Sequence, residues 1–270
     1  RPAPLQVGWL AYPGTSGAPW LDYVIADRVV LPERLAAHFS EQVAYLPRCF
    51  QPSDPGRSVG EPPPRAACGL GASGVVYACF NNGYKINPAS FERMLAVLRE
   101  VPDAQLWLLA GVDGADARLR EQARRRGVDP ARLAFMPKQP HADYLARYRH
   151  ADLFLDCSPY NAHTTASDAI WAGCPLLTVP GETFAARVAA SLNHHLGVPE
   201  LNARDDAAFV AAAVRLGRDA AARSALRERV AAQRDASGLF DMRGFAADFA
   251  ALLGEIAQRR RAGLPPARLG

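Results

Sequence analysis

The chain has 270 residues, of which 49% are hydrophobic and 21% charged, and its formal net charge is +4. This length and composition indicate a globular protein with a sizeable core rather than a disordered chain. The longest apolar runs are far too short to cross a membrane, and the first residues do not resemble an export signal. The positive charge comes without a nucleic-acid-binding motif, so neither a membrane nor a nucleic acid is an expected partner.

The cysteines indicate a reducing compartment. The chain has five, at Cys49, Cys68, Cys79, Cys157 and Cys174. They form no CxxC pair and no Cys/His spacing typical of a metal site. We expect reduced core residues in a cytoplasmic protein. The chain also lacks a cluster of carboxylates that would indicate a bound divalent metal.

The first third of the chain contains three strand-like segments and a proline-rich stretch. The strand patterns lie at Leu5–Leu10, Tyr23–Ala26 and Gln42–Leu46, and a short helix is predicted over Leu31–Phe39. Residues 51–66 hold five prolines and little apolar content. This composition is typical of a linker or surface loop, so we expect a domain junction there.

From Val75 onward, short apolar segments alternate with helical patterns. The predicted strands are Val75–Phe80, Gln105–Leu109, Leu133–Phe135, Leu153–Leu155 and Leu176–Val179. The predicted helices are Pro88–Glu100, Ala115–Arg126, Ala142–Tyr148, Thr164–Ala172, Glu182–Leu192, Asp205–Leu216, Ala220–Gln233 and Arg243–Arg261. This alternation predicts an α/β fold with a Rossmann-like, doubly wound parallel sheet.

The stretch from Leu153 to Pro175 reads as strand, loop and helix, with His163, Thr164 and Thr165 at the helix start. A helix start presents unpaired N–H groups and a partial positive charge, which favours a bound phosphate. The alternative is that one of the threonines only caps the helix. The residues leave these two interpretations open.

Lysine is rare in this chain. Of 31 basic residues only Lys85 and Lys138 are lysines, and each follows a predicted strand. Lysine supplies a compact point charge where arginine supplies a planar fork, so a lysine in an arginine-rich chain suggests a specific role. The alternative is chance placement on two surface loops.

Three loops bring polar side chains to the carboxyl ends of predicted strands, where doubly wound sheets bind ligands. They carry Asn82 and Lys85, then Lys138 and His141, then His163, Thr164, Thr165 and Asp168. Asp168 can accept hydrogen bonds from a ribose or complete a capping box, and His141 can stack on a base or begin its helix. A sugar nucleotide fits this set, whereas the absence of GxGxxG and GxxxxGK[ST] motifs disfavours dinucleotide and P-loop chemistry.

Several motifs resemble the carboxyl-terminal part of the catalytic region of the O-GlcNAc transferase family, including its bacterial and plant SPINDLY-like members. They are Tyr12-Pro-Gly-Thr-Ser-Gly17, Asp22-Tyr-Val-Ile-Ala-Asp27, Phe80-Asn-Asn-Gly-Tyr-Lys-Ile86, Pro137-Lys138 with His141, His163-Thr-Thr165, Asp168, Trp171-Ala-Gly173, Pro180-Gly-Glu-Thr183 and Arg187-Val-Ala-Ala-Ser191. They run in the family's order from about Leu5 to Ser191.

This resemblance implies a GT-B glycosyltransferase that moves GlcNAc from UDP-GlcNAc to Ser or Thr hydroxyls of proteins, with inversion and without a required metal. It implies that Lys85 holds the diphosphate together with Thr164 and Thr165. Candidate uridine contacts are Lys138 and His141, and the candidate ribose contact is Asp168. Lys85 and His163 are the candidate catalytic residues, and His163, Pro13 and Gly14 are implied to lie near the phosphates and sugar.

Two positions depart from the family pattern. Asn82 stands where the family usually has Gln, and Tyr160 occupies a sugar-side position that is smaller in the animal enzymes. Because the plant relatives include enzymes that use fucosyl donors, the resemblance leaves the exact sugar open.

The resemblance also implies how the chain is divided. Residues 1–50 correspond to the tail of the amino-terminal catalytic lobe, 51–66 to a linker or surface loop, and 67–270 to the UDP-sugar-binding lobe with its closing helices. Helical repeats and most of the first lobe are expected upstream, so we expect the chain to bind UDP but not to transfer sugar unaided.

Two other functions stay open. The chain can belong to another UDP-sugar enzyme of similar fold, such as an epimerase that does not use NAD. That chemistry needs further acid/base carboxylates near the sugar, and the sequence shows no clear pair. The other alternative is a non-catalytic nucleotide-binding domain.

Overall fold

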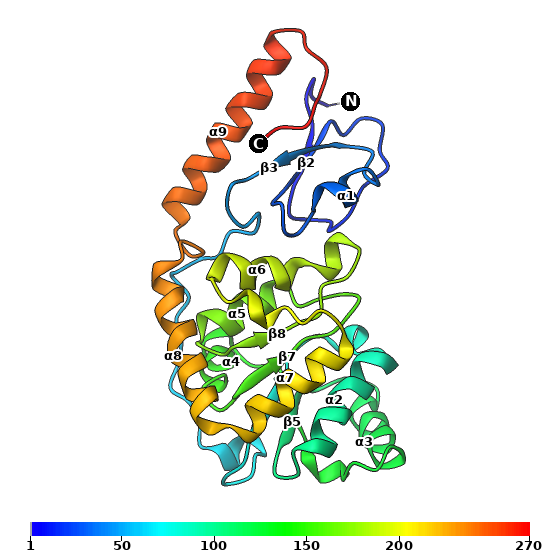
Figure 1. Ribbon diagram of the computed structural model, residues 1–270, viewed down its shortest axis with the longest axis vertical. Coiled ribbons are helices and arrows are strands. Elements are labelled where there is room, and N and C mark those ends of the chain that lie inside the picture. The colour runs from blue at the N-terminus through cyan, green and yellow to red at the C-terminus, as the bar shows by residue number, and fades with distance from the viewer. Residues whose placement is uncertain (1) are drawn as a thin grey trace.

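The computed structural model describes residues 2–270, which form two separate parallel sheets (Figure 1). The first sheet has the order β1-β2-β3, with β1 (Val7–Gly8), β2 (Tyr23–Ala26) and β3 (Gln42–Tyr45). The second has the order β6-β5-β4-β7-β8, with β4 (Val76–Cys79), β5 (Gln105–Leu109), β6 (Leu133–Met136), β7 (Leu153–Leu155) and β8 (Leu176–Leu177).

Helices surround the sheets. They are α1 (Glu33–Ala36), α2 (Pro88–Glu100), α3 (Ala115–Arg125), α4 (His141–Arg147), α5 (Thr164–Trp171), α6 (Val188–Leu196), α7 (Asp206–Arg218), α8 (Ala220–Ala236) and α9 (Met242–Arg261). In this described part, no helix has the length and apolar character that a membrane span requires.

The structure confirms the predicted α/β fold with a doubly wound parallel sheet. Helix α2 has the predicted bounds because its start is well marked: the Asn87 side chain accepts a hydrogen bond from the N–H of Ser90, and Pro88 occupies the first turn. All four residues of β4 are buried, as expected for a strand covered on both faces.

The helix predicted over Glu182–Leu192 is present with other bounds, since α6 spans Val188–Leu196. Thr183 instead caps a short 3-10 turn at Phe184–Ala186, and α6 begins only at Val188. Between them Arg187 leaves the helical conformation. Its Nε donates to the carbonyl oxygen of Val29 at 2.9 Å and its Nη1 to that of Gly181 at 3.0 Å, so this residue ties the turn to the segment that follows β2.

The strand order of the second sheet reverses between β4 and β7. These two strands pair directly, with Ala78 opposite Phe154. From β4 the chain continues outward to β5 and β6, whereas β8 lies on the other side of β7. Ligands of doubly wound sheets bind beyond the carboxyl ends of the strands at such a point. The loops leaving β4 and β7 carry Lys85 and His163, so the fold places them at one edge.

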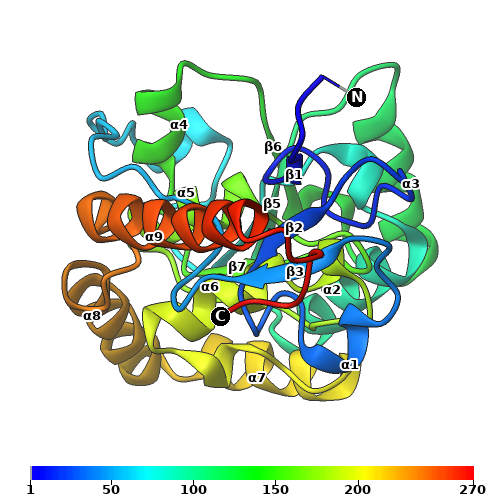
Figure 2. The ribbon, with the colours of Figure 1, turned by 90° about the horizontal axis from the view of Figure 1, so that it is seen from above.

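Helix α9 returns from the second sheet to the first (Figures 1 and 2). Phe249 in α9 contacts Trp9, with ring centroids 4.5 Å apart, and Asp248 accepts a hydrogen bond from Arg48 Nε at 2.5 Å. The end of the chain then pairs Leu269 with Ala44 beside β3. The division of the chain at 51–66 stays a prediction, and α9, which that division assigns to the second lobe, packs against the first sheet.

Candidate functional site

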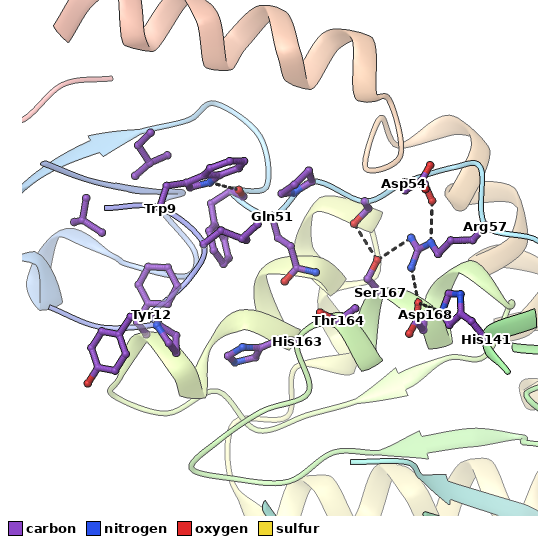
Figure 3. A pocket seen from close by; sticks show the side chains of 18 residues that line it. Trp9, Tyr12, Gln51, Asp54, Arg57, His141, His163, Thr164, Ser167 and Asp168 are labelled. Atoms are coloured by element: carbon purple, nitrogen blue, oxygen red, sulfur yellow. Dashed lines mark hydrogen bonds and ion pairs between the residues drawn. The ribbon is translucent and has the colours of Figure 1, made fainter. Parts of the chain in front are cut away.

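A cavity of about 320 Å³ lies between the two sheets (Figure 3). Trp9, Tyr12 and Pro13 line it from the loop that follows β1, and the first two turns of α5 line it from the opposite side. A third wall comes from residues 50–54 and Arg57, in the segment that joins the sheets. A cleft between two parts of a molecule, with a few polar groups converging on it, is a typical small-molecule site.

The start of α5 opens into this cavity. The N-cap residue is His163, and its side chain makes no capping hydrogen bond. Thr164 and Thr165 therefore lie inside the first turn rather than capping it, and Thr164 lines the cavity. The N–H groups of a first turn lack partners within the helix and carry partial positive charge. Neither threonine caps the helix, and the unpaired N–H groups of its first turn can bind an anionic group.

His163 is held as a neutral ring. Its Nε2 donates a hydrogen bond to the carbonyl oxygen of Ala185 at 3.1 Å, which leaves Nδ1 as an acceptor. Burial lowers the pKa of His163 to about 4, and the positive charge of Lys85 also lowers it. The ring stacks on Tyr160, with centroids 4.9 Å apart. At neutral pH the ring therefore carries no charge, and its Nδ1 can accept a hydrogen bond from a ligand.

Lys85 links the two loops at the switch in strand order. Its Nζ donates to the carbonyl oxygen of Asn161 at 2.8 Å and lies 4.3 Å from the centre of the Tyr160 ring. Burial lowers the pKa of Lys85, an effect that the charge of Asp156 opposes. An ammonium that is partly desolvated and held by neutral partners is well suited to bind an anion.

Asp156 holds the loop that carries these groups. Its Oδ1 accepts hydrogen bonds from the backbone N–H groups of Cys157 and Ala162 and from Asn81 Nδ2, and its Oδ2 accepts one from the hydroxyl of Thr178. Burial raises the pKa of Asp156, while these hydrogen bonds act against that rise. One buried carboxyl group therefore shapes the turn between β7 and α5 and fixes the position of His163.

Asp168 lies one turn further along α5 and is paired with Arg57. The Oδ1 atom of Asp168 is 2.7 Å from Arg57 Nη1, and the two side chains are only 8% and 10% exposed. His141 Nε2 lies 3.4 Å from the same oxygen (Figure 3). The capping-box alternative does not describe this residue, because its carboxylate engages Arg57 and His141 instead of the helix start.

The predicted residues fall into four groups. Five line the cavity: Pro13, His141, His163, Thr164 and Asp168. Lys85 and Thr165 lie next to those residues, whereas Gly14 lines a second cavity of about 700 Å³. Asn82 and Lys138 are exposed and line neither cavity. The ligand roles assigned to all these residues stay predictions.

The second cavity adjoins the first. Tyr12, Pro13 and Phe184 line both. Tyr160, which stacks on His163, lines only the second, together with the turn at Thr183–Ala185 and the side of α1. The Tyr160–His163 pair therefore stands at the boundary between the two spaces.

Sequence reasoning missed the wall formed by residues 50–57. Its prolines predict a linker, yet Gln51, Ser53 and Arg57 line the cavity. The Oγ of Ser53 lies 3.0 Å from that of Ser167, and the indole N–H of Trp171 donates to the carbonyl oxygen of Arg57 at 2.9 Å. No local pattern signals these contacts, because their partners lie more than a hundred positions along the chain.

Comparison with known proteins identifies the family. The profile of glycosyl transferase family 41 matches residues 1–57 and 63–249, which is most of the chain. The chain belongs to glycosyl transferase family 41. The resemblance inferred from the motifs is thereby confirmed, and the site described above lies within the matched residues of a family 41 protein.

Curated relatives carry related names. The chain is 29% identical over 377 residues to the UDP-N-acetylglucosamine--peptide N-acetylglucosaminyltransferase of Caenorhabditis elegans, covering 98% of this chain and 33% of that protein. It is 36% identical over 198 residues to a probable enzyme of the same name, SEC, of Arabidopsis thaliana, covering 71% and 20%. It is 31% identical over 231 residues to a probable enzyme of that name, SPINDLY, of Petunia hybrida, covering 84% and 25%. The chain thus spans about a third or less of these relatives.

Solved structures agree with the family. A mutant of the Thermobaculum terrenum O-GlcNAc transferase superposes with a TM-score of 0.85 at 30% identity, covering 96% of this chain and 48% of that chain. WaaG, a glycosyltransferase involved in lipopolysaccharide biosynthesis, superposes with a TM-score of 0.57 at 16% identity, covering 92% and 78%, which shows the fold alone. The predicted GT-B-like architecture of this family 41 chain is confirmed.

Proposed function

We propose that the protein containing this chain transfers GlcNAc from UDP-GlcNAc to serine or threonine hydroxyls of proteins, and that this chain supplies the donor-binding lobe. One observation carries the proposal. Lys85, His163 and the start of α5 converge at the carboxyl ends of β4 and β7, beside a cavity that also contains Asp168. The printed names of the relatives, which specify UDP-N-acetylglucosamine and a peptide acceptor, support this donor and acceptor.

The site can bind each part of the donor. The ammonium of Lys85 and the free N–H groups at Thr164 and Thr165 would hold the diphosphate. The Asp168 carboxylate would accept hydrogen bonds from the ribose, with His141 and Lys138 on the uridine side. Pro13 and Gly14 would approach the sugar from the first sheet. Asn82 would support the loop of Lys85, since its carbonyl oxygen accepts the backbone N–H of that lysine.

The proposed reaction is a displacement with inversion. The oxygen of the acceptor hydroxyl forms a bond to the anomeric carbon while the bond from that carbon to the diphosphate oxygen breaks. UDP leaves with the electron pair, and the proton of the hydroxyl passes to the departing UDP or to solvent. Negative charge grows on the diphosphate as this bond breaks, so fixed positive groups beside it lower the barrier. Lys85 and the start of α5 supply that charge. Neutral His163 adds a hydrogen-bonding group.

Three further features belong to the proposal. The transferase needs no metal, since Lys85 and α5 take the role of a cation toward the diphosphate. The full-length protein carries helical repeats and the rest of the first lobe upstream. It works in the cytoplasm, a location supported by its five buried cysteines, which are free thiols.

Calorimetry with UDP, UDP-GlcNAc and ADP tests the proposal. We expect UDP to bind in preference to ADP, and Lys85→Ala to weaken UDP binding by about 1.5–3 kcal/mol, the range for a hydrogen bond to a charged group. Arg204→Gln, which removes an exposed arginine paired with Asp205, serves as the control. Unchanged UDP affinity in Lys85→Ala would remove the central residue from the proposal. Transfer of GlcNAc to a serine peptide by the full-length protein then separates a transferase from an epimerase or an inactive domain.

A further inference from the structure

The segment 50–57 is a fixed wall of the site. The indole N–H of Trp9 donates to the carbonyl oxygen of Phe50 at 3.1 Å, which ties one end to the first sheet. The contacts of Ser53 with Ser167 and of Arg57 with Trp171 tie the other end to α5. The segment is thus held from both sides of the cavity, and its side chains have defined positions.

Arg57 is the most firmly held side chain of this wall. Its Nε donates to the carbonyl oxygen of Asp54 at 2.8 Å, its Nη1 to Asp168 Oδ1 at 2.7 Å and its Nη2 to the hydroxyl of Ser167 at 3.0 Å. The guanidinium also lies 5.5 Å from the ring centres of both Trp171 and Phe240. Polar and aromatic contacts together fix its plane, a geometry that a flexible lysine cannot reproduce.

This arrangement leaves one oxygen of Asp168 available. Oδ1 is engaged by Arg57 and lies near His141, whereas Oδ2 accepts no hydrogen bond from any of residues 2–270. Asp168 lines the cavity. An ionised carboxylate only accepts hydrogen bonds, so a ligand atom that meets Oδ2 must be a donor such as a hydroxyl group.

We propose that Arg57 is a positioning residue that makes the site selective for ribonucleotides. It holds the Asp168 carboxylate so that Oδ2 faces a ribose hydroxyl of a pyrimidine nucleoside diphosphate. This inference rests on the proposed function, which places UDP in the cavity. A site built to pair with a hydroxyl rejects the analogue that lacks it, because its own polar group is then left unpaired.

The test is calorimetric titration with UDP and with its 2′-deoxy and 3′-deoxy analogues. We expect the wild-type chain to bind UDP at least about tenfold more tightly than one deoxy analogue, as for a hydrogen bond to a charged group. Arg57→Gln should weaken UDP binding and bring the ratio of the two affinities close to one, while the affinity for the deoxy analogue changes little. Arg57→Lys should keep only part of the ratio, and Arg204→Gln should keep all of it.

A double-variant cycle separates positioning from damage to the fold. Asp168→Asn keeps the size of the side chain and should also bring the ratio of the affinities for UDP and its deoxy analogue close to one. Adding Arg57→Gln to this variant should not change that ratio further. Equal weakening of UDP and its deoxy analogue in Arg57→Gln would mean that Arg57 only supports the fold and would overturn the inference. An unchanged ratio would overturn it as well. A wild-type chain that binds no UDP would instead overturn the proposed function.

Discussion

The two ends of the candidate site balance their charges differently. At one end Asp168 and Arg57 form a buried ion pair within the chain itself. At the other end the contacts of Lys85, within residues 2–270, are a carbonyl oxygen and a tyrosine ring, neither of which carries a full negative charge. A buried charge is stable only when it is paired. The first end is therefore complete without a ligand, whereas the second is suited to receive a counter-charge from one.

This difference suits the two ends to different roles: the Asp168 end to recognition of the nucleoside and the Lys85 end to the reaction. A paired carboxylate offers a fixed acceptor and little net field, which favours discrimination between similar nucleosides. An unpaired ammonium attracts a leaving diphosphate more strongly as negative charge grows on it, which stabilises the transition state. The comparison holds only if changes at the two ends have different consequences, which four measurements can establish.

The largest expected effect is on the rate of transfer. Lys85→Met removes the ammonium but keeps much of the apolar part of the side chain. It should lower kcat of the full-length protein by about 10²–10³-fold, the usual effect of removing one hydrogen-bond donor to the transition state. Lys85→Arg should also lower the rate, because a planar fork does not fit the space of a point charge. Steady-state kinetics with UDP-GlcNAc and a serine peptide measure this. Full activity in Lys85→Arg would contradict the importance of a compact charge.

The second effect is on stability, and it should be large only at the end of the site that holds the Arg57–Asp168 pair. Arg57→Ala leaves the Asp168 carboxylate buried without its partner, which should lower the free energy of unfolding by about 3 kcal/mol. Lys85→Met should lower it by less, about 1 kcal/mol, since it leaves only the neutral carbonyl oxygen of Asn161 without its donor and strands no buried charge. Urea unfolding of both variants measures the contrast. Equal losses would mean that both ends are paired alike.

The third effect is a pH dependence of stability that comes from His163, at the end of the site that holds Lys85. In the folded chain the pKa of His163 is about 4, below its ordinary value of 6.5. As the pH falls below 6.5 the unfolded chain takes up a proton that the folded chain refuses until about pH 4, so stability falls across this window. We expect a loss on the order of 1–2 kcal/mol between pH 7 and pH 5.

Urea unfolding at the two pH values checks this expectation. His163→Gln should remove that part of the loss, whereas His194→Gln, at an exposed histidine, should retain it. If both variants lose stability with pH as the wild-type chain does, burial of His163 is not the cause.

The smallest effect concerns Lys138. This residue is exposed and lies outside the cavity, so Lys138→Ala should weaken UDP binding by less than about threefold, as for an exposed ionic contact. Calorimetry measures it beside Lys85→Ala. A loss of UDP affinity as large as that in Lys85→Ala would mean that a second ammonium contacts the ligand. It would sharpen the contrast with the end of the site where Asp168 is paired with Arg57.

The sequence predicts those features that depend on neighbouring residues. The bounds of α2 follow from Asn87 and Pro88, and the position of the helix start at His163 follows from the strand and turn before it. The grouping of Lys85 with His163 follows from a general rule for parallel sheets, since both loops leave neighbouring strands at the same edge.

Features that depend on distant partners were not predictable in this way. The Arg57–Asp168 pair joins positions 111 residues apart, and the prolines around Arg57 indicate only an irregular segment. Arg187 likewise breaks a helix that its own sequence favours, because its guanidinium bonds to Val29, in the segment that follows β2. In both cases tertiary contacts override the local pattern.

The return of α9 to the first sheet has a mechanical consequence. The chain passes between the two sheets once near Arg48 and again at the start of α9, and Arg48 spans these passages by contacting Asp241 at 3.5 Å and Asp248 at 2.5 Å. The two parts are joined at other places as well: the Ser191 hydroxyl donates to Asp27 Oδ2 at 2.6 Å, and Arg187 Nε donates to the carbonyl oxygen of Val29 at 2.9 Å. Any opening of the cleft that separated the two sheets would therefore have to break these hydrogen bonds as well as bend both crossings.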